Sequence, residues 1–432
     1  MFFKNENGLA CPREYTNKSF TYQRNLMKIL LHDYSGHPLE AQLSRALANR
    51  GHEVLHLYSA SFQTPHGLLE RRGGDPNNLI FEGICLKAEF KKYSFYKRRK
   101  QEKEYGGLLA KRVQEFNPKI VISANTPLDP QKILLKTCRR NGIKFIFWLQ
   151  DVYGVAIEQT LRKRIPLIGT LIGRYYTSLE KKLLNQSDKI IAISDDFKNL
   201  LHQWGLAIET IEVIQNWGPV DDIPLLPKSN PWSKEHGLAD KINLLYSGTL
   251  GLKHNPELLL KLALFFKDHK NVRIVVISEG LGAEWLLQKK NELGLHHLMI
   301  MRYQPFEVLP YTLASADILL AVLNSEAGIY SVPSKILAYL CAGKPLLAAI
   351  PKENLSARII SDFNSGIVVS PNDTIELTTK AKQLIEDEKL RFEMAKAGRA
   401  YAEKAFNISS ITDRFEEIFK DIFDSKRPHF YQ

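Results

Sequence analysis

The sequence predicts an α/β protein of two doubly wound domains, each a parallel β-sheet wrapped by helices. Three observations carry this prediction. The chain has 432 residues, and a domain usually holds about 100–200 residues. Short apolar runs alternate with helix-length amphipathic segments, which is the pattern of a parallel sheet. The stretch 217–240 is rich in proline and turn-forming residues, and this predicts the domain boundary.

Both halves repeat the same plan of strands and helices. In the first half, the runs that predict strands are KILLHDY (28–34), EVLHLYS (53–59), KIVISA (119–124), KFIFWL (144–149), KIIAIS (189–194) and TIEVIQNW (210–217). In the second half, they are INLLYSG (242–248), VRIVVIS (272–278), LMIMRY (298–303), DILLAVL (317–323) and PLLAAI (345–350). Ligands of such sheets bind outside the carboxyl ends of the strands, so the loops after the strands are the candidate sites.

Composition and pattern divide the chain into four parts. Residues 1–26 show no helical or alternating pattern, and we expect them to be disordered or to precede the native start. The two domains are expected at 27–220 and 221–405. Residues 406–432 are expected to form a C-terminal helix, with a return to the N-terminal domain as one of its possible courses.

Charge is unevenly distributed along the chain. Residues 1–220 hold 33 Lys and Arg against 21 Asp and Glu, an excess of 12, whereas residues 221–432 hold 26 of each. A basic half favours a polyanion or an anionic membrane surface, although a generally basic proteome produces the same bias. No apolar stretch reaches the length of about 18 residues that predicts a membrane span.

The four cysteines form no CxxC pair, which favours a reducing, cytoplasmic compartment without a structural metal. Cys85 and Cys341 lie in apolar segments and are expected in the core. Several nucleotide-binding motifs are also absent, because the sequence contains no GxGxxG after a first strand, no GxxxxGK[ST] and no DxD triplet. If the protein binds a diphosphate, helix ends and cationic side chains would therefore have to neutralise its charge. We expect neither a metal nor a resident cofactor.

The segment SGTLGLKHNPE (247–257) predicts a phosphate-binding loop between a strand and a helix. Gly248 and Gly251 let the backbone approach a ligand closely. Lys253 adds a cation beside the loop, and amides with a nearby positive charge suit a diphosphate. A simple strand-to-helix turn is the alternative explanation of the same glycines.

A second candidate is EAGIYSVPSKILAYLCAGKP (326–345), where a helix is expected to start near Pro333. Ser331 or Ser334 can cap that start with a hydroxyl. Lys335 then lies at the positive end of the helix dipole, an unfavourable place that a bound anion would make favourable. A solvated lysine is the alternative.

Two further strand ends complete the candidate ligand edge of the second half. SEGLGAEW (278–285) offers a glycine-rich turn with Gly280 before a helix. In MRYQP (301–305), the backbone groups of Tyr303 are placed to meet a flat base. Each signal is weak alone, but four such loops at one edge of one domain favour a common binding site.

These residues together resemble the retaining GT-B glycosyltransferases of family 4, from Met27 to about Phe423. YSGTLGLKHNPELLL is similar to the family's glycine-rich loop, and ADILLAVL with VPSKILAYLCAGKPLLA is similar to its donor-site segment. The resemblance extends to bacterial surface-polysaccharide members, among them colanic acid and O-antigen fucosyl-type transferases. It implies the GT-B fold, in which two Rossmann-like domains face a cleft.

The resemblance assigns donor-side roles residue by residue. Lys253 matches the family's diphosphate lysine, and Glu326 matches the first of two glutamates, which faces the donor sugar. Thr249 stands where an arginine is common, and Ser334 replaces the second glutamate, so the ribose contact is in doubt. We interpret Ser334 and Lys335 as donor-binding substitutes. The expected donor-binding residues are Gly248, Thr249, Gly251, Lys253, Gly280, Tyr303, Ser331, Ser334 and Lys335.

The expected catalytic residues are Lys253, Glu326 and Asp151. Asp151 lies in WLQDVYG (148–154), which resembles the family's His-Asp segment near the reaction centre, and its alternative is a turn residue. SGHPLEAQL resembles the loop that lies under the donor phosphates and meets the acceptor, so Gly36 and His37 are expected to bind the acceptor. The sequence SDDF at 194–197 predicts a helix N-cap rather than a catalytic carboxylate pair.

The resemblance implies retaining transfer of a hexose-type sugar from a nucleoside diphosphate to a hydroxyl, in surface polysaccharide biosynthesis. The basic first half suggests that this hydroxyl belongs to a lipid-linked glycan, and the missing DxD triplet predicts a reaction without a metal. Two alternatives remain: a sugar-nucleotide 2-epimerase of the same fold, and a non-catalytic sugar-nucleotide-binding partner of a transferase. Thr249 and Ser334, each in place of a charged residue, favour the non-catalytic partner among these alternatives.

Two segments of the basic half suggest contact with a membrane. FKKYSFYKRRK (90–100) interleaves cations with aromatics, and LRKRIPLIGTLIGRYYTSLEKK (161–182) has an apolar centre with basic ends that suits lying in the interface. The alternatives are a solvated charge run and a core-packed helix. We expect a peripheral protein at the cytoplasmic face of the inner membrane. Its expected partners are a nucleotide-sugar donor, a lipid-linked or glycan acceptor and an anionic membrane surface, but no nucleic acid.

Overall fold

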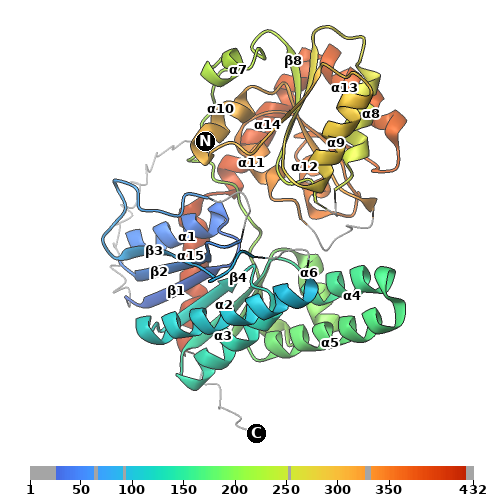
Figure 1. Ribbon diagram of the computed structural model, residues 1–432. Helices are drawn as coiled ribbons and strands as arrows, with labels where there is room; N and C mark the ends of the chain where they lie inside the picture. Colours follow the sequence, from blue (N-terminus) through green and yellow to red (C-terminus); the bar gives the residue numbers. More distant parts are fainter. Residues whose placement is uncertain (1–25, 63–66, 91–93, 252–253, 326–331, 425–432) are drawn as a thin grey trace, which may run out of the picture.

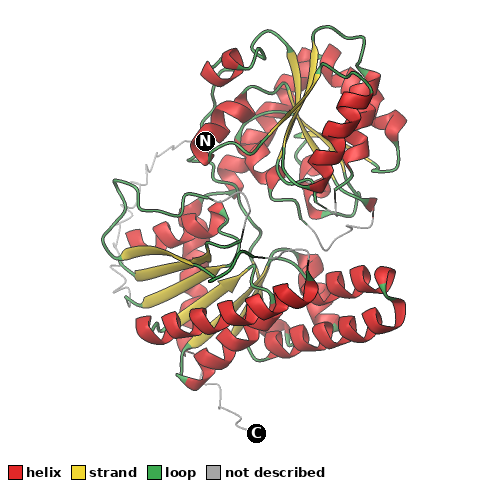
Figure 2. Ribbon diagram, in the orientation of Figure 1, coloured by secondary structure: helices red, strands yellow, loops and turns green. Residues whose placement is uncertain are grey.

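The computed structural model describes residues 26–62, 67–90, 94–251, 254–325 and 332–424. They form two α/β domains, one above the other in Figure 1, and Figure 2 shows each sheet as a layer of strands between helices. The two-domain, doubly wound α/β fold expected from the sequence is therefore confirmed. The expectations for residues 1–25 concern a part of the chain that lies outside the described residues.

The N-terminal domain is built on a parallel sheet with seven strands in the described part of the chain, in the order β3-β2-β1-β4-β5-β6-β7. The strands are β1 (Lys28–Asp33), β2 (Glu53–Ser59), β3 (Leu79–Ile84), β4 (Ile120–Ala124), β5 (Lys144–Leu149), β6 (Lys189–Ala192) and β7 (Ile211–Val213). The helices are α1 (Pro38–Asn49), α2 (Phe95–Phe116), α3 (Leu128–Arg140), α4 (Tyr153–Arg164), α5 (Pro166–Asn185) and α6 (Asp195–Gln203), with the 3-10 turn η1 (Ile208–Thr210) before β7.

The C-terminal domain repeats the arrangement with a parallel sheet of six described strands, in the order β10-β9-β8-β11-β12-β13. The strands are β8 (Ile242–Ser247), β9 (Val272–Ile277), β10 (Leu298–Met301), β11 (Ile318–Val322), β12 (Leu346–Ala349) and β13 (Gly366–Val369). The helical elements are α7 (Pro231–Glu235), α8 (Pro256–Phe265), α9 (Leu281–Glu292), η2 (Phe306–Val308), α10 (Leu309–Ala314), α11 (Lys335–Cys341), α12 (Leu355–Asp362), α13 (Thr374–Glu386) and α14 (Glu388–Ala405).

The predicted strands all occur, but the apolar pattern missed the edge strands β3 and β13. The central strands β4 and β11 are buried along their whole length, so both of their faces are apolar, which makes them easy to recognise. The edge strand β3 is only partly buried and carries Glu82 within it. Cys85, which we expected in the core, is exposed directly after this strand. None of the described helices is long and apolar enough to cross a membrane.

The last described helix, α15 (Ile408–Asp424), leaves the C-terminal domain and packs against α1 of the N-terminal domain. Figure 1 shows it beside α1 and β1 in the lower domain. Its apolar side supplies Phe415, which is fully buried. The ring centre of Phe415 lies 5.2 Å from that of Trp148 and 6.5 Å from that of Trp217. The C-terminal segment therefore belongs to the core of the N-terminal domain.

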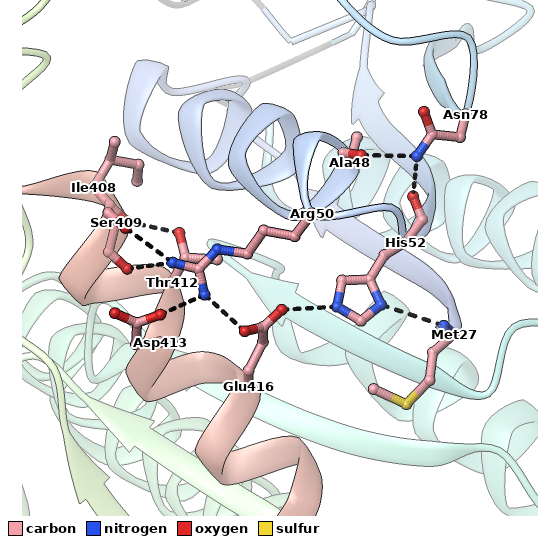
Figure 3. A network of polar contacts seen from close by, with 10 residues as sticks. All are labelled: Met27, Ala48, Arg50, His52, Asn78, Ile408, Ser409, Thr412, Asp413 and Glu416. Carbon is pink, nitrogen blue, oxygen red and sulfur yellow. Dashed lines mark hydrogen bonds and ion pairs between the residues drawn. The ribbon is translucent and has the colours of Figure 1, made fainter. Parts of the chain in front are cut away.

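A polar network reinforces this contact beside the aromatic one (Figure 3). The guanidinium of Arg50, at the end of α1, lies 2.6 Å from the carboxylates of both Glu416 and Asp413. The second carboxylate oxygen of Glu416 lies 3.0 Å from Nε2 of His52. Because the amide of Met27 donates to Nδ1 of the same ring, His52 carries its proton on Nε2 and donates to Glu416. This network thus joins α15 to the α1–β2 turn and to Met27, just before β1.

We expect Phe415→Ala to lower the free energy of unfolding of the N-terminal domain by roughly 3–5 kcal/mol, the usual cost of emptying a buried aromatic site. Urea unfolding followed by near-UV circular dichroism would measure the change. Phe423→Ala on the same helix is the matched control, since Phe423 is 45% exposed and should matter little. Equal losses in both variants would contradict this account.

Candidate functional site

The loop after β8 turns sharply at Gly248, which has a φ of +131°. A Cβ atom at this position would lie 3.0 Å from Cε and 3.2 Å from Nζ of Lys335. Glycine is therefore required both for the backbone conformation and for the space that the lysine side chain takes. The structure thus brings together two of the predicted donor-binding residues that are far apart in the sequence.

The side chain of Lys335, at the start of α11, lies over Tyr246 of β8. Its Nζ is 3.7 Å from the centre of the tyrosine ring and also hydrogen-bonds the tyrosine hydroxyl. Burial raises the pKa of Tyr246 well above its usual value, so the phenol stays neutral beside the cation. One turn later, the hydroxyl of Tyr339 accepts from the amide of Ser247 and donates to its carbonyl. The start of α11 is thereby fixed against the end of β8.

Of the two serines expected to cap this helix, only Ser334 can be compared with the structure, and its side chain does not cap the helix. Ser334 occupies the N-cap position but is exposed, and its hydroxyl makes no capping hydrogen bond with the described residues. Its backbone is helical at this position, whereas a capping side chain needs an extended one. The predicted residues Ser331, Glu326 and Lys253 lie outside the described residues.

Three amides in the described part of the glycine-rich loop donate to other groups of the protein. The amide of Gly248 donates to the carbonyl of Ile277 at 2.9 Å, and that of Gly251 donates to Nδ1 of His254 at 3.1 Å. The amide of Leu250 donates to the hydroxyl of Ser278 at 3.0 Å. The expectation that Gly248 and Gly251 let the backbone approach a donor stays a prediction. The cation that suits a phosphate here is Lys335 of α11, whose side chain packs against this loop.

Tyr303, at the carboxyl end of β10, joins the same edge through its side chain. Its hydroxyl lies 2.9 Å from that of Thr249, so two predicted donor-binding residues are in contact. Its backbone N–H, which we expected to meet a base, donates instead to Glu279. Gly280 follows with a φ of +99° and is the N-cap of α9. Gly282, which sequence reasoning missed, lets α9 approach, because a Cβ there would lie 2.7 Å from the carbonyl of Leu250.

The acceptor-side residues Gly36 and His37 follow β1, with Gly36 at a φ of +72°. Buried Asp33 holds this turn, because its carboxylate accepts from the amides of Ser35 and His37. The side-chain amide of Asn125, at the end of β4, lies 2.9 Å from Asp33 and 3.2 Å from Nδ1 of His37.

Glu40 of α1 lies within the same cluster and is completely buried. Burial first, and then the charge of Asp33, raise its pKa well above the usual value, so the pair holds a proton. Oε1 accepts from Asn125 at 3.0 Å, and Oε2 has no partner among the described residues. The ligand atoms of Asp33, His37 and Glu40 lie within 4.8 Å of one another. The Asn125 amide donates to the two carboxylates and reaches the ring of His37, and the expected absence of a metal stays a prediction.

Asp151 follows β5 and is half-buried at the start of α4. The next residues connect it to the acceptor side, because the hydroxyl of Tyr153 donates to the carbonyl of Asn125 at 3.1 Å. Glu180 of α5 accepts from the amides of Tyr153 and Gly154 at 2.9 and 2.8 Å, and so caps α4 from another helix. Neither Asn125 nor Glu180 carried a sequence signal, because their roles depend on contacts between separate elements.

The segment 194–197 caps a helix, as its sequence predicts. The hydroxyl of Ser194 accepts from the amide of Phe197 at the start of α6. Asp196 makes an ion pair with Arg358 of α12, so the segment also links the two domains. The carboxylate of Asp196 therefore has a structural partner.

Two family models match consecutive parts of the chain. The model described as Glycosyltransferase Family 4 matches residues 41–221, and the model described as Glycosyl transferases group 1 matches residues 229–401. The first match contains β2 to β7 and the second contains β8 to β13, and the two meet at the segment between the sheets. This chain is a GT-B glycosyltransferase.

Two relatives are similar to this glycosyltransferase at low sequence identity. "Probable glycosyltransferase WbjE" of Pseudomonas aeruginosa is 21% identical over 247 residues, which are 57% of this chain and 60% of the relative. The N-acetyl-alpha-D-glucosaminyl L-malate synthase of Bacillus anthracis is 22% identical over 278 residues, 61% of this chain and 70% of that protein. The match thus spans less than two thirds of the first relative.

Solved structures share the fold over almost the whole glycosyltransferase. HepE of Anabaena in complex with UDP and glucose has a TM-score of 0.67 at 17% identity, covering 91% of this chain and 99% of its own. WaaG, a glycosyltransferase involved in lipopolysaccharide biosynthesis, has a TM-score of 0.63 at 16% identity, covering 90% and 99%. At such identities the likeness establishes the GT-B architecture and no finer property.

Glu180 makes the stability of the glycosyltransferase depend on pH. Burial raises its pKa from 4.5 to about 8, against the opposing effect of the amides of Gly154 and Tyr153. The folded protein therefore keeps this proton while the unfolded chain loses it, and stability falls as pH rises from 4.5 to about 8. The loss amounts to about 1.4 kcal/mol per pH unit within that window.

We expect Glu180→Gln to remove this slope, because glutamine does not titrate. The free energy of unfolding of both proteins, measured by urea titration at several pH values, gives the comparison. Glutamine also loses one of the two amide contacts, so the diagnostic quantity is the slope rather than the level. An unchanged slope in the variant would show that another group is responsible.

Proposed function

We propose that this glycosyltransferase moves a hexose-type sugar from a nucleoside-diphosphate sugar to a hydroxyl of a lipid-linked glycan, with retention of configuration, in surface polysaccharide biosynthesis. The observation that supports the donor class is the packing of Lys335 into the Gly248 turn, at the carboxyl end of β8. This is the edge where doubly wound sheets bind their ligands. HepE, which shares the fold, was solved with UDP and with UDP-glucose.

In the proposed reaction, the bond between the anomeric carbon and the β-phosphate oxygen breaks, and the acceptor oxygen bonds the same carbon from the same face. The acceptor proton passes to the leaving diphosphate. Lys253 and Lys335 stabilise the negative charge that develops on this diphosphate. Glu326 contacts the donor sugar, while Asp151 and the Gly36–His37 turn orient the acceptor.

A lipid-linked acceptor agrees with the distribution of charge. The excess of 12 positive charges lies in residues 1–220, most of which form the domain that carries the proposed acceptor side. A basic surface is attracted to anionic lipids by up to about 1 kcal/mol for each nearby Lys or Arg. We therefore place the working protein at the cytoplasmic face of the inner membrane.

A single screen separates this proposal from its alternatives. The purified protein is incubated with labelled nucleotide-sugars and bacterial membranes, with and without EDTA. Transfer to lipid, undiminished by EDTA, is the expected result. Recovery of an isomerised donor would indicate an epimerase, and binding without turnover would indicate a non-catalytic partner of a transferase.

We expect Lys253→Ala to lower kcat/KM by roughly 100-fold or more, the scale of losing one preorganised charge contact. Initial rates over a range of donor concentrations would measure the loss. Lys261→Ala, on the exposed side of α8, is the control and should leave the rate unchanged. Near-normal turnover by Lys253→Ala would remove this lysine from the site.

Gly248→Ala should weaken binding of the nucleotide-sugar by about 10-fold or more, because the new methyl group would push Lys335 away from its place. A loss of this size corresponds to about 1.4 kcal/mol. Gly294→Ala is the matched control: Gly294 also has a positive φ, of +63°, but no described atom lies within 4 Å of the added Cβ. Isothermal titration with the donor found in the screen compares the two. Similar affinities in both variants would contradict the assignment.

A further inference from the structure

The helices α4 and α5 form an antiparallel hairpin that extends from the N-terminal domain (Figure 1). They are joined at Ile165, where the backbone leaves the helical conformation. Small residues let the two helices touch: a Cβ on Gly173 would lie 2.6 Å from Cα of Glu158, and one on Gly169 would lie 2.3 Å from the carbonyl of Leu161. The hairpin is therefore closely packed along its length.

The end of α5 that joins the domain is firmly held. Leu179, Leu183 and Leu184 are buried in the core of the domain. The hydroxyl of Tyr176 donates to Asp129 of α3 at 2.9 Å. The segment 161–182 therefore does not form the single interfacial helix suggested by its sequence. Its C-terminal part is a core helix, and its N-terminal part is the turn of a hairpin.

The turn of this hairpin exposes large aliphatic side chains. We call the group of Ile165, Leu167, Ile168 and Leu171 the hairpin tip. Their exposed fractions are 48%, 85%, 58% and 68%. Single exposed apolar residues are common on protein surfaces, but a group within seven consecutive residues marks an interaction surface.

Cations accompany the hairpin tip. Residues 162–174, which include the tip, contain four Lys and Arg and no Asp or Glu. Arg162 and Arg174, on either side of the tip, are both exposed. Tyr175 is 46% exposed next to them. Aliphatic residues bordered by cations and tyrosine have the chemistry of a lipid interface, where the apolar groups enter the acyl region and the cations meet phosphate.

We propose that the hairpin tip inserts into an anionic lipid surface and anchors the N-terminal domain to it, end-on rather than flat. The choice of a lipid partner rests on the proposed function, which places the acceptor in a membrane. Pairing of two tips from separate copies is disfavoured, because it would bring like-charged rims together. A neutral protein partner would leave those cations without a role.

Insertion can be measured without any sugar substrate. Flotation with vesicles of phosphatidylglycerol and phosphatidylethanolamine should recover the full-length protein, whereas pure phosphatidylcholine vesicles should recover much less. The double variant Leu167→Ser/Leu171→Ser should bind about 10-fold more weakly or worse, because two exposed aliphatic groups no longer leave water. The matched control is Ile375→Ser/Phe392→Ser, which changes two apolar residues that are 78% and 63% exposed in the other domain.

A tryptophan introduced at the hairpin tip reports directly on how deeply the tip enters the lipid. Leu167→Trp should show a blue-shifted emission with anionic vesicles, and brominated acyl chains should quench it. Equal vesicle binding by the tip variant and its control would overturn the proposal, as would a tryptophan that stays unquenched. A concentration-dependent dimer in sedimentation velocity that the tip variant abolishes would assign the surface to a second copy instead.

The same variants separate this proposal from the proposed function. If vesicle binding requires the tip while the donor screen detects no transfer, the results support the tip as a membrane-binding surface and contradict the proposed enzymatic function. If transfer occurs in the screen and the tip variant binds vesicles normally, the enzymatic proposal stands and the membrane surface fails.

Discussion

A stack of aromatic rings holds the molecule together at the junction of its domains. Trp148 at the end of β5 stacks on Trp217 of the linker, with ring centres 5.6 Å apart, and Phe415 of α15 packs against both. The indole N–H of Trp217 donates to Gln42 of α1. Because these rings come from the first domain, the linker and the last helix, the path of the chain between the domains is fixed by their packing.

This constraint extends toward the proposed donor site. Gly218, the next residue of the linker, lies so close to α11 that a Cβ there would be 2.6 Å from the sulfur of Cys341. The other end of α11 carries Lys335 against Gly248. The short helix α11 thus contacts the linker at one end and the Gly248 turn, through Lys335, at the other. The proposed acceptor side is organised differently, by a buried pair of carboxyl groups around Asn125.

Sequence patterns located the strands and the loops after them, but they described single side chains less well. The position of Lys335 at a helix start singled it out as a candidate. In the structure, contacts with Tyr246 and Gly248 fix the place of its side chain. Ser334 has the right residue type for a cap and the wrong backbone conformation. Asn125 and Glu180 gave no signal, since an asparagine after a strand and a glutamate in a helix are ordinary until their partners are known.

The sequence by itself determined the two doubly wound domains, and it predicted the boundary between them and the loops of the candidate site. These features depend on local periodicity and turn chemistry, which each segment carries alone. The tertiary structure decided that α15 completes the first domain, that the loop amides bond within the protein, and that 161–182 turns back as a hairpin with an exposed tip. These outcomes depend on which surfaces meet in three dimensions, because only packing between distant segments determines which apolar side chains are covered and which face the solvent.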